Sequence, residues 1–236
     1  RFIGWVLNLR NILAKGGVEF IAVFLGIVLS LWVDDYRDSA NVKENKYNSL
    51  DAVSLELIDN KETLSIIITN IENNDKFRDR LLLTDDIVNQ KLSSKDSIWN
   101  ANIIPLGNKL YVNAYKNMAS SGLLYKISDR KLLYEIQSIY EYEIPNFEWW
   151  VDYETKFVEH VDKYIIKNLA LNKKGYNWEL DWNNQLTIEG IKTTEFQNII
   201  IGNSSNRDAL KYYAEKLILS IDIILKDINN YSEKRQ

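Results

Sequence analysis

Few residues in this chain have the types and the spacing that catalysis or metal binding requires. The 236 residues include no cysteine and a single histidine, His160, so a metal site built from several histidines or cysteines is excluded. The sequence also lacks a glycine-rich phosphate loop, a nucleophile elbow and an HExxH helix. His160 follows Glu159 in a stretch rich in aromatic residues, where packing or exposure is the ordinary role of a histidine. We therefore expect no enzymatic activity, no cofactor and no metal.

Carboxylates and tryptophans are the next candidates. Acidic residues are plentiful, as in the pair Glu141 and Glu143, but acid pairs on helical faces are usually solvated. Some aromatic rings could stack on a sugar or a peptide, although packing in a core or an interface is their commoner use. These rings belong to Trp149, Trp150, Trp178 and Trp182.

Glu19 is the ionisable residue with the most unusual setting, because it directly precedes Phe20–Val33, fourteen residues without a charge. An ionisable group inside a membrane is costly and often functional, for example in ion or proton passage through an oligomer. Alternatively, Gly16 and Gly17 interrupt the helix, and Glu19 then falls in the first turn of a membrane span. There, free backbone amides and the positive helix end would stabilise the carboxylate.

A membrane anchor over residues 16–35 is the element that would position Glu19. At about 1.5 Å per residue, Phe20–Val33 covers roughly 21 Å of a hydrocarbon core about 30 Å thick, and its flanks extend it close to a full span. Trp32 marks the exit, and residues 1–15 have the apolar spacing of an amphipathic interfacial helix. A buried core helix is the alternative for so short a run. No small-residue cleavage site follows, so we expect an uncleaved anchor rather than a secretion signal.

The remainder, residues 36–236, is predicted to be one helical domain. The chain has nine glycines and two prolines, few turn-formers for an all-β protein. Its net charge is −4; residues 1–33 carry three basic residues and one acid, so the remainder is at −6. An acidic surface without basic clusters argues against nucleic acid as a partner.

Helical apolar spacing and turn residues place the boundaries of the predicted elements. We predict helices over 39–73, 77–90, 109–120, 128–144, 146–169, 195–201 and 207–231. Breaks are predicted at Asn73-Asn74-Asp75, over 91–108, at Gly122, near Pro145, over 172–192 (with a possible short hairpin) and at Gly202-Asn203-Ser204-Ser205-Asn206. The fold class is therefore mainly α: an interfacial helix, one transmembrane helix and a bundle with long coiled-coil-like helices.

Two of these helices carry heptad-like stripes. The first consists of Leu50, Val53, Leu57, Asn60, Leu64, Ile67 and Ile71; the second of Leu210, Ala214, Leu217, Ile221, Ile224, Ile228 and Tyr231. Buried asparagines in coiled coils fix register, which makes Asn60 a candidate interface residue. Apolar heptad positions form the seam of a coiled coil, so further candidates on the second stripe are Leu217, Ile221, Ile224 and Ile228. Alternatively, the first stripe packs on the chain's own later helices and Asn60 lies at its edge.

Two stretches resemble an uncharacterised bacterial family of single-span membrane proteins. Val23–Arg37, preceded by Glu19, resembles the family's anchor, although Val18 separates Gly17 from Glu19 and Tyr36 replaces the usual exit tryptophan. Ala114–Glu141 is similar to a middle stretch with an aromatic residue, two serines and a glycine. The resemblance implies a mostly helical, single-pass protein of the bacterial inner membrane and no particular activity.

Three functions are compatible with these features. The first is a membrane-anchored scaffold or assembly subunit that forms a homo-oligomer or joins a larger membrane complex. The second is an oligomeric channel or proton-coupled protein that uses Glu19, and the third is an enzyme without a recognisable motif. Lysine and arginine are balanced at three on each flank of the anchor. Acids are concentrated downstream but contribute little to topology. We favour a cytoplasmic N-terminus and a periplasmic helical domain.

Overall fold

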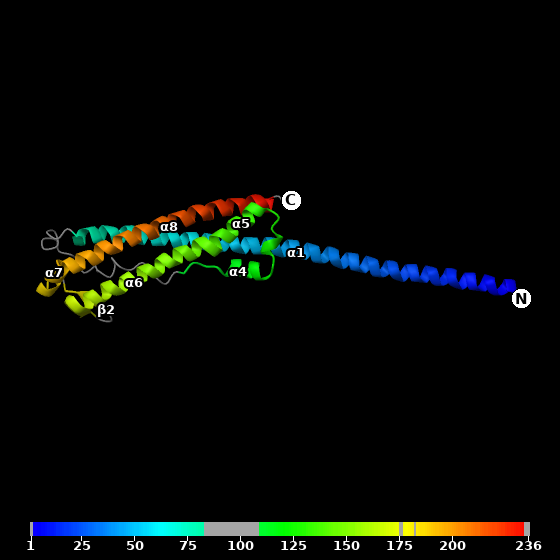
Figure 1. Ribbon diagram of the computed structural model, residues 1–236, viewed down its shortest axis with the longest axis horizontal. Helices are drawn as coiled ribbons and strands as arrows, with labels where there is room; N and C mark the ends of the chain where they lie inside the picture. The colour runs from blue at the N-terminus through cyan, green and yellow to red at the C-terminus, as the bar shows by residue number, and fades with distance from the viewer. Residues whose placement is uncertain (1, 83–108, 175–176, 182, 234–236) are drawn as a thin grey trace. The chain divides into compact units, whose positions relative to one another are not determined.

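The computed structural model describes residues 2–82, 109–174, 177–181 and 183–233. Side chains are described within these ranges except at 2–19, 22, 77–82, 174, 177–179 and 203. The described chain is mainly helical, which confirms the predicted class (Figure 1). It divides into two compact units, residues 1–49 and residues 50–236.

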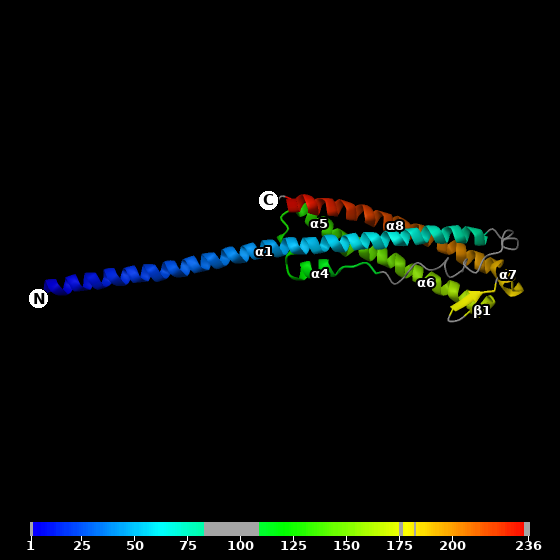
Figure 2. The same ribbon diagram turned by 180° about the vertical axis from the view of Figure 1, so that it is seen from behind.

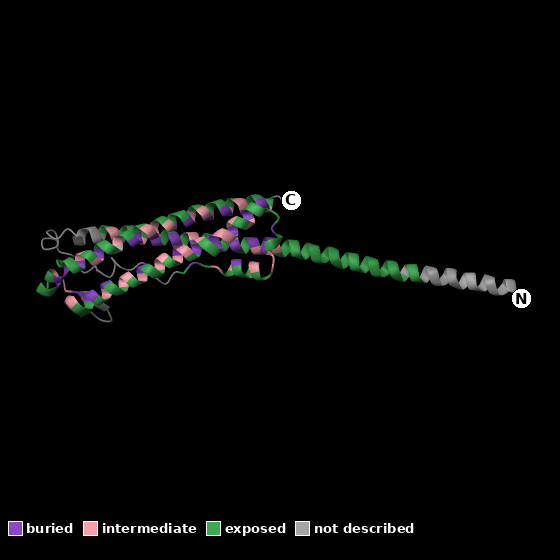
Figure 3. Cartoon of the chain, viewed as in Figure 1, coloured by how far each residue is buried: buried purple, intermediate pink, exposed green. Residues whose placement is uncertain are grey.

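The first unit belongs to the helix α1 (Phe2–Leu82). Along residues 20–33 the large apolar side chains are exposed all around the helix, from 43% for Val28 to 69% for Phe20 (Figure 3). Nowhere in the described residues is a helix both long and apolar enough to cross a membrane. The transmembrane span predicted over 16–35 thus lacks structural support, and its positions 16–19 and 22, including Glu19, have side chains outside the described set. The same holds for the side chains of the interfacial helix predicted over 1–15.

The second unit is a bundle of long helices. The part of α1 that follows residue 49 lies beside α8, to which it is joined by the ion pairs Lys61–Asp222 and Glu72–Lys211 (Figures 1 and 2). The helix α8 also packs along a rod made of α5, η2 and α6. These elements are α5 (Arg130–Ser138), the π-helix η2 (Ile139–Glu143), α6 (Ile144–Asn168) and α8 (Thr194–Glu233).

Short elements complete this unit. The strands β1 and β2 form an antiparallel hairpin within the predicted long connection, with Leu171 paired to Leu180. The helix α7 packs against the end of α6, where Gly190 leaves room for the Leu169 side chain; a Cβ there would lie 2.3 Å from Leu169 Cδ2. The short elements are α4 (Asn113–Ser120), the 3-10 helix η1 (Leu124–Lys126), β1 (Leu171–Lys174), β2 (Asn177–Leu180) and α7 (Gln185–Ile191).

Both heptad-like stripes form the core of this unit. Every member of the α1 stripe is at most 1% exposed, and every member of the α8 stripe is buried. A three–four spacing places such residues on one face of a helix, and burying that face removes the apolar surface from water. The first stripe therefore packs on the chain's own later helices, as the alternative prediction had it. Asn60 lies in the middle of the stripe rather than at its edge.

Two predicted boundaries agree with the structure, the break at Gly122 and the start of a helix near residue 128. Gly122 follows α4 with φ of 73°, a left-handed conformation that glycine adopts without steric cost. Asp129 caps α5 by accepting hydrogen bonds from the amides of Lys131 and Leu132, at 3.0 and 3.2 Å.

The break predicted at Asn73-Asn74-Asp75 was wrong, because α1 continues through it to Leu82. Asn74 is buried there, so tertiary packing overrides the low helix propensity of these residues. The rest of the helix predicted over 77–90 and the irregular stretch 91–108 lie outside the described residues.

The helix end predicted near Pro145 was also wrong. Pro145 lies in the first turn of α6, which follows η2 without interruption. Proline has no amide hydrogen, and in a regular helix its ring clashes with the carbonyl four residues earlier. The wider turn of the π-helix immediately before it accommodates the proline, so the rod continues instead of stopping.

The break predicted at Gly202-Asn203-Ser204-Ser205-Asn206 is absent as well, since α8 runs from Thr194 to Glu233. Asn206 and the next residue, Arg207, are both bonded to Glu154 of α6. These tertiary bonds fix the end of a segment whose own propensity for helix is low.

Neighbouring isoleucines of α8 offer a matched test of the core. We expect Ile221→Ala to lower the free energy of unfolding by about 2–5 kcal/mol, because Ile221 is fully buried and its truncation leaves a cavity. Ile223, two residues on, is 53% exposed, and Ile223→Ala should change it by less than about 0.5 kcal/mol. Urea unfolding of the full chain, followed by circular dichroism, measures both; equal losses would contradict this assignment of the core.

Candidate functional site: a backbone clamp, a buried ion pair and an aromatic surface

The residues selected from sequence as a candidate interface lie inside the chain's own core. Leu217, Ile221, Ile224 and Ile228 are between 0 and 2% exposed, and Asn60 is fully buried. In this fold none of them presents surface to a partner. The side chain of Glu19, the candidate intramembrane residue, lies outside the described set.

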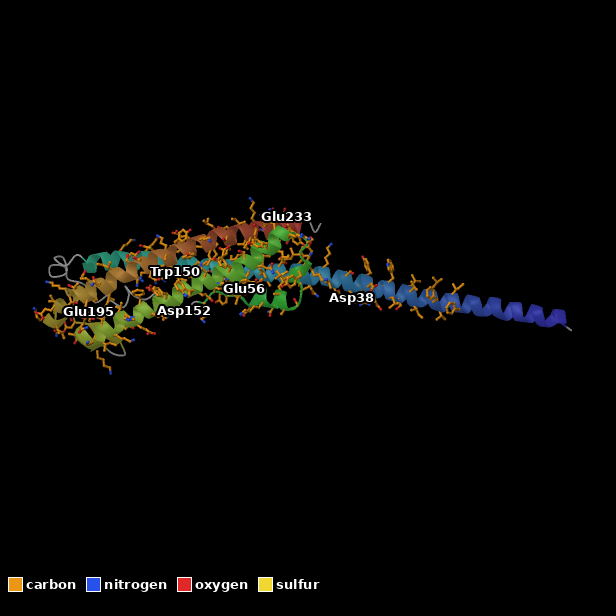
Figure 4. All side chains as sticks on the ribbon, viewed as in Figure 1. Asp38, Glu56, Trp150, Asp152, Glu195 and Glu233 are labelled. Atoms are coloured by element: carbon orange, nitrogen blue, oxygen red, sulfur yellow. The ribbon has the colours of Figure 1, made fainter. Side chains whose placement is uncertain are left out.

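Asn60 forms, together with Glu56 one turn earlier on α1, what we call the α4 clamp. The Asn60 side chain accepts a hydrogen bond from the Tyr111 amide (2.6 Å) and donates one to the Tyr111 carbonyl (2.8 Å). The Glu56 carboxylate accepts from the amides of Ala114 (2.7 Å) and Tyr115 (3.3 Å). Figure 4 labels Glu56 at its place on α1. All four bonds go to main-chain atoms.

The α4 clamp supplies a cap that α4 lacks. The residue before α4, Val112, has no side chain able to accept from the first helical amides. The Glu56 carboxylate, which lies on α1, accepts these hydrogen bonds instead, and its negative charge is favoured at the positive end of α4. Glu56 is only 8% exposed, so removing the bonded amides would leave its carboxylate buried without these partners.

Two tyrosines lie beside the α4 clamp, where α4 meets the π-helix η2. The rings of Tyr115 and Tyr140 are nearly parallel with centroids 4.4 Å apart, and the Tyr115 hydroxyl donates to the Glu141 carboxylate. Burial, reinforced by the Glu141 carboxylate, raises the pKa of Tyr115 well above its ordinary value. Burial, and then the nearby Glu56 carboxylate, likewise raises the pKa of Tyr140. Both phenols therefore stay protonated at neutral pH and serve packing.

A buried ion pair joins α6 to α8. The Glu154 carboxylate accepts from Arg207 Nε at 3.0 Å and from Asn206 Nδ2 at 2.5 Å, and all three residues are at most 4% exposed. Among the described residues, Arg207 Nη2 and Asn206 Oδ1 are buried without a hydrogen-bond partner. Such a pair gains little over apolar packing while intact, but loss of one member leaves an uncompensated charge.

An aromatic surface lies along the seam of α6 and α8. It consists of Trp149, Trp150, Tyr153, Tyr212 and Tyr213. Trp149 stacks on Tyr153 (centroids 5.6 Å apart, 9° between planes), and Trp150 stacks across the seam on Tyr213 (5.6 Å, 24°). Trp149, Tyr153 and Tyr212 are exposed at 56, 39 and 60%. Figure 4 labels Trp150 on α6.

The described part of the chain offers little for catalysis or metal binding. No three metal-binding side chains gather there, and exposed His160 bonds through Nδ1 to the Lys156 carbonyl one turn earlier. A cavity of about 70 Å³ beside Lys109 and Asp152 has room for a few waters. Of the tryptophans considered as a stacking groove, Trp149 and Trp150 join the aromatic surface. The side chains of Trp178 and Trp182 lie outside the described set. What the arrangement offers is binding surface.

Several residues that matter here were not predicted from the sequence. Glu56 and Arg207 carry no local signal, because their role depends on partners 58 and 53 residues away in the chain. Tyr212 and Tyr213 did carry a signal: an adjacent aromatic pair on a helix, like Trp149 and Trp150. Each of these two pairs lies on a long predicted helix, so a contact between the pairs could have been predicted.

Removal of the Glu154 charge should be strongly destabilising. We expect Glu154→Gln to lower the free energy of unfolding by about 3–5 kcal/mol, because the buried Arg207 charge would lose its counter-ion. The triple variant Glu154→Leu/Asn206→Leu/Arg207→Met, which also removes the buried amide bonded to Glu154, should recover most of that loss. As a control, Asp222→Asn breaks the exposed pair with Lys61 and should cost at most about 1 kcal/mol. Denaturant unfolding of the four proteins decides; similar effects at both pairs would refute the buried charge as the cause.

Comparisons of the chain with family models, curated proteins and solved structures gave no match. The family resemblance of Val23–Arg37 and Ala114–Glu141 therefore stays a prediction.

Proposed function

We propose that this chain is a membrane-tethered, protein-binding subunit whose helical domain contacts another protein through the aromatic surface. The observation that carries this proposal is the exposure of stacked tryptophan and tyrosine rings on two rigid helices. Tryptophan and tyrosine dominate the energetics of protein interfaces, and residues fixed by their neighbours lose little entropy on binding.

The aromatic surface is larger than the core packing of α6 and α8 requires. Trp150 and Tyr213 close the seam between the two helices and are half-buried. Trp149 and Tyr212 flank them on the outside, each held edge-to-face by the neighbouring ring at 4.8 and 5.3 Å. A contiguous apolar patch of this kind on an otherwise acidic protein favours a binding role.

The tether rests on residues 20–33. Their apolar side chains surround α1 and remain exposed within the first unit, although a helix apolar on all sides is normally surrounded by protein or lipid. The exposed pair Trp32 and Tyr36, with ring centroids 6.3 Å apart, fits the headgroup level, and Asp34, Asp35 and Asp38 follow there. We propose the bacterial inner membrane as the surroundings of this segment, with the N-terminus cytoplasmic and the helical domain periplasmic. The channel role for Glu19 has no further observation in its favour.

Charges placed inside the tether should release the chain from membranes. We expect the full chain, expressed in bacterial cells, to stay with the membrane pellet after an alkaline carbonate wash. Leu25→Arg/Leu29→Arg should shift it to the supernatant, because each arginine at the centre of a span costs about 2.5–3.5 kcal/mol. Leu55→Arg/Ile58→Arg, at exposed positions beyond the tether, is the matched control and should stay in the pellet. A wild-type chain found in the supernatant would refute the tether.

Truncation of the aromatic surface should abolish association while leaving the fold intact. The mass of the detergent-solubilised full chain, with any co-purifying protein, reports the complex. We expect Trp149→Ala/Tyr212→Ala to reduce the complex to the mass of the lone chain, since each interface aromatic contributes about 2 kcal/mol or more. Tyr125→Ala/Tyr134→Ala removes two rings of similar exposure elsewhere and should leave the mass unchanged. A complex equally stable in both variants would exclude this surface as the contact.

A further inference from the structure

An open groove runs along one face of the rod formed by α5 and η2. Its volume is about 510 Å³, within the range of small-molecule sites. Five side chains line it: Tyr134, Gln137, Ser138, Glu141 and Tyr142. The two tyrosines are 71 and 68% exposed, and the other three residues form hydrogen bonds. The groove therefore offers two aromatic rings with polar groups between them.

The π-helix η2 aligns the two rings. Tyr142 follows Tyr134 by eight residues, which in a regular α-helix leaves about 80° between the two side chains. Most of η2 precedes Tyr142, and a π-turn takes up about one additional residue. The two side chains are thereby related like residues seven apart, with a rotation of about 20° and a rise of about 11 Å. Both rings consequently line the same groove, two helical turns apart.

The polar residues between the rings favour a ligand that both donates and accepts hydrogen bonds. Gln137 and Ser138 each offer a donor and an acceptor, whereas the Glu141 carboxylate only accepts. The hydroxyl of Tyr115 on α4 bonds one oxygen of this carboxylate and holds it in place. A ligand that covers the Glu141 carboxylate without donating to it would leave the charge desolvated. Proline-rich segments also dock on aromatic grooves, but their prolines have no N–H to donate.

Saccharides meet both requirements. A pyranose ring has an apolar face of C–H groups that stacks on an aromatic ring, and its hydroxyl groups donate and accept hydrogen bonds. In an extended β-1,4-linked chain every second ring presents the same face, at a spacing close to two helical turns. Two such rings can therefore stack on Tyr134 and Tyr142, while the hydroxyls of the ring between them reach the polar side chains of the groove.

We propose that the groove on α5 and η2 binds an extended β-1,4-linked saccharide chain. Tyr134 and Tyr142 are its stacking platforms, and the polar side chains between them bond the hydroxyl groups. This activity goes beyond the proposed function, because none of the residues of the aromatic surface lines the groove. The same helical unit then holds a saccharide site and a separate surface for a protein.

Isothermal titration calorimetry of the full chain with cello-oligosaccharides, in a detergent without a sugar headgroup, tests this. Cellotriose should bind at least tenfold more tightly than cellobiose, because three rings are the shortest chain that reaches both tyrosines. Tyr142→Ala should remove that difference, and Tyr142→Phe should keep it, since stacking needs only the ring. Tyr125→Ala, the matched control, removes a 65% exposed ring outside the groove and should change neither affinity.

The proposal is overturned if cellotriose does not bind the wild-type chain or binds no more tightly than cellobiose. An equal loss of affinity in Tyr125→Ala and Tyr142→Ala overturns it too, as does a proline-rich peptide that binds this groove in place of cellotriose. Since Tyr142 is exposed, its replacement should leave the circular dichroism spectrum unchanged. Tyr142→Ala should also leave the mass of the detergent-solubilised complex unchanged, and Trp149→Ala/Tyr212→Ala should leave cellotriose binding unchanged. The saccharide site and the proposed function can therefore fail separately.

Discussion

The burial of two apolar stripes, one on α1 and one on α8, is the constraint on which the helical unit depends. Each stripe runs along one face of a long helix and cannot be left in water. Once α1 and α8 lie together, with α5, η2 and α6 against α8, the remaining side chains have little freedom in where they point. The ion pairs along the seam, such as Lys61–Asp222, are exposed and contribute mainly to alignment.

That constraint explains which parts of the fold could be predicted. The stripes were visible because spacing along a helix is a local property of the sequence. The break at Gly122 and the helix start near residue 128 were predicted because a left-handed turn and an N-cap each need only their own neighbours. The breaks at Asn73-Asn74-Asp75, Pro145 and 202–206 were local arguments too, and all three failed. The break at Pro145 failed because the π-helix η2 precedes the proline, and the other two failed where distant partners decide. Glu154 holds the residues after 202–205 in a helix, and no inspection of 202–206 reveals it.

The same division applies to the candidate sites. Asn60 was recognisable as a polar residue in an apolar row, and this position indicated that it is buried. A buried asparagine can, however, bond either a helix of a partner or another part of its own chain. The choice depended on Tyr111, whose main-chain groups need bonding in a stretch without regular structure. The aromatic surface assembles from residues 149–153 and 212–213, some sixty residues apart in the chain. Composition had indicated rings without showing that they meet.

The π-helix η2 also sets the rotational phase of everything after it. A π-turn holds more residues than an α-turn, so it acts as a one-residue insertion that turns the following helix by about 100° relative to an uninterrupted one. Glu154 faces Arg207, and Trp150 faces Tyr213, only in this phase. A rod without the extra residue would be equally helical and equally apolar, yet it would direct the carboxylate and the rings to different sides. One additional residue between Ile139 and Glu143 therefore determines both which side of α6 enters the core and which side carries the exposed aromatic rings.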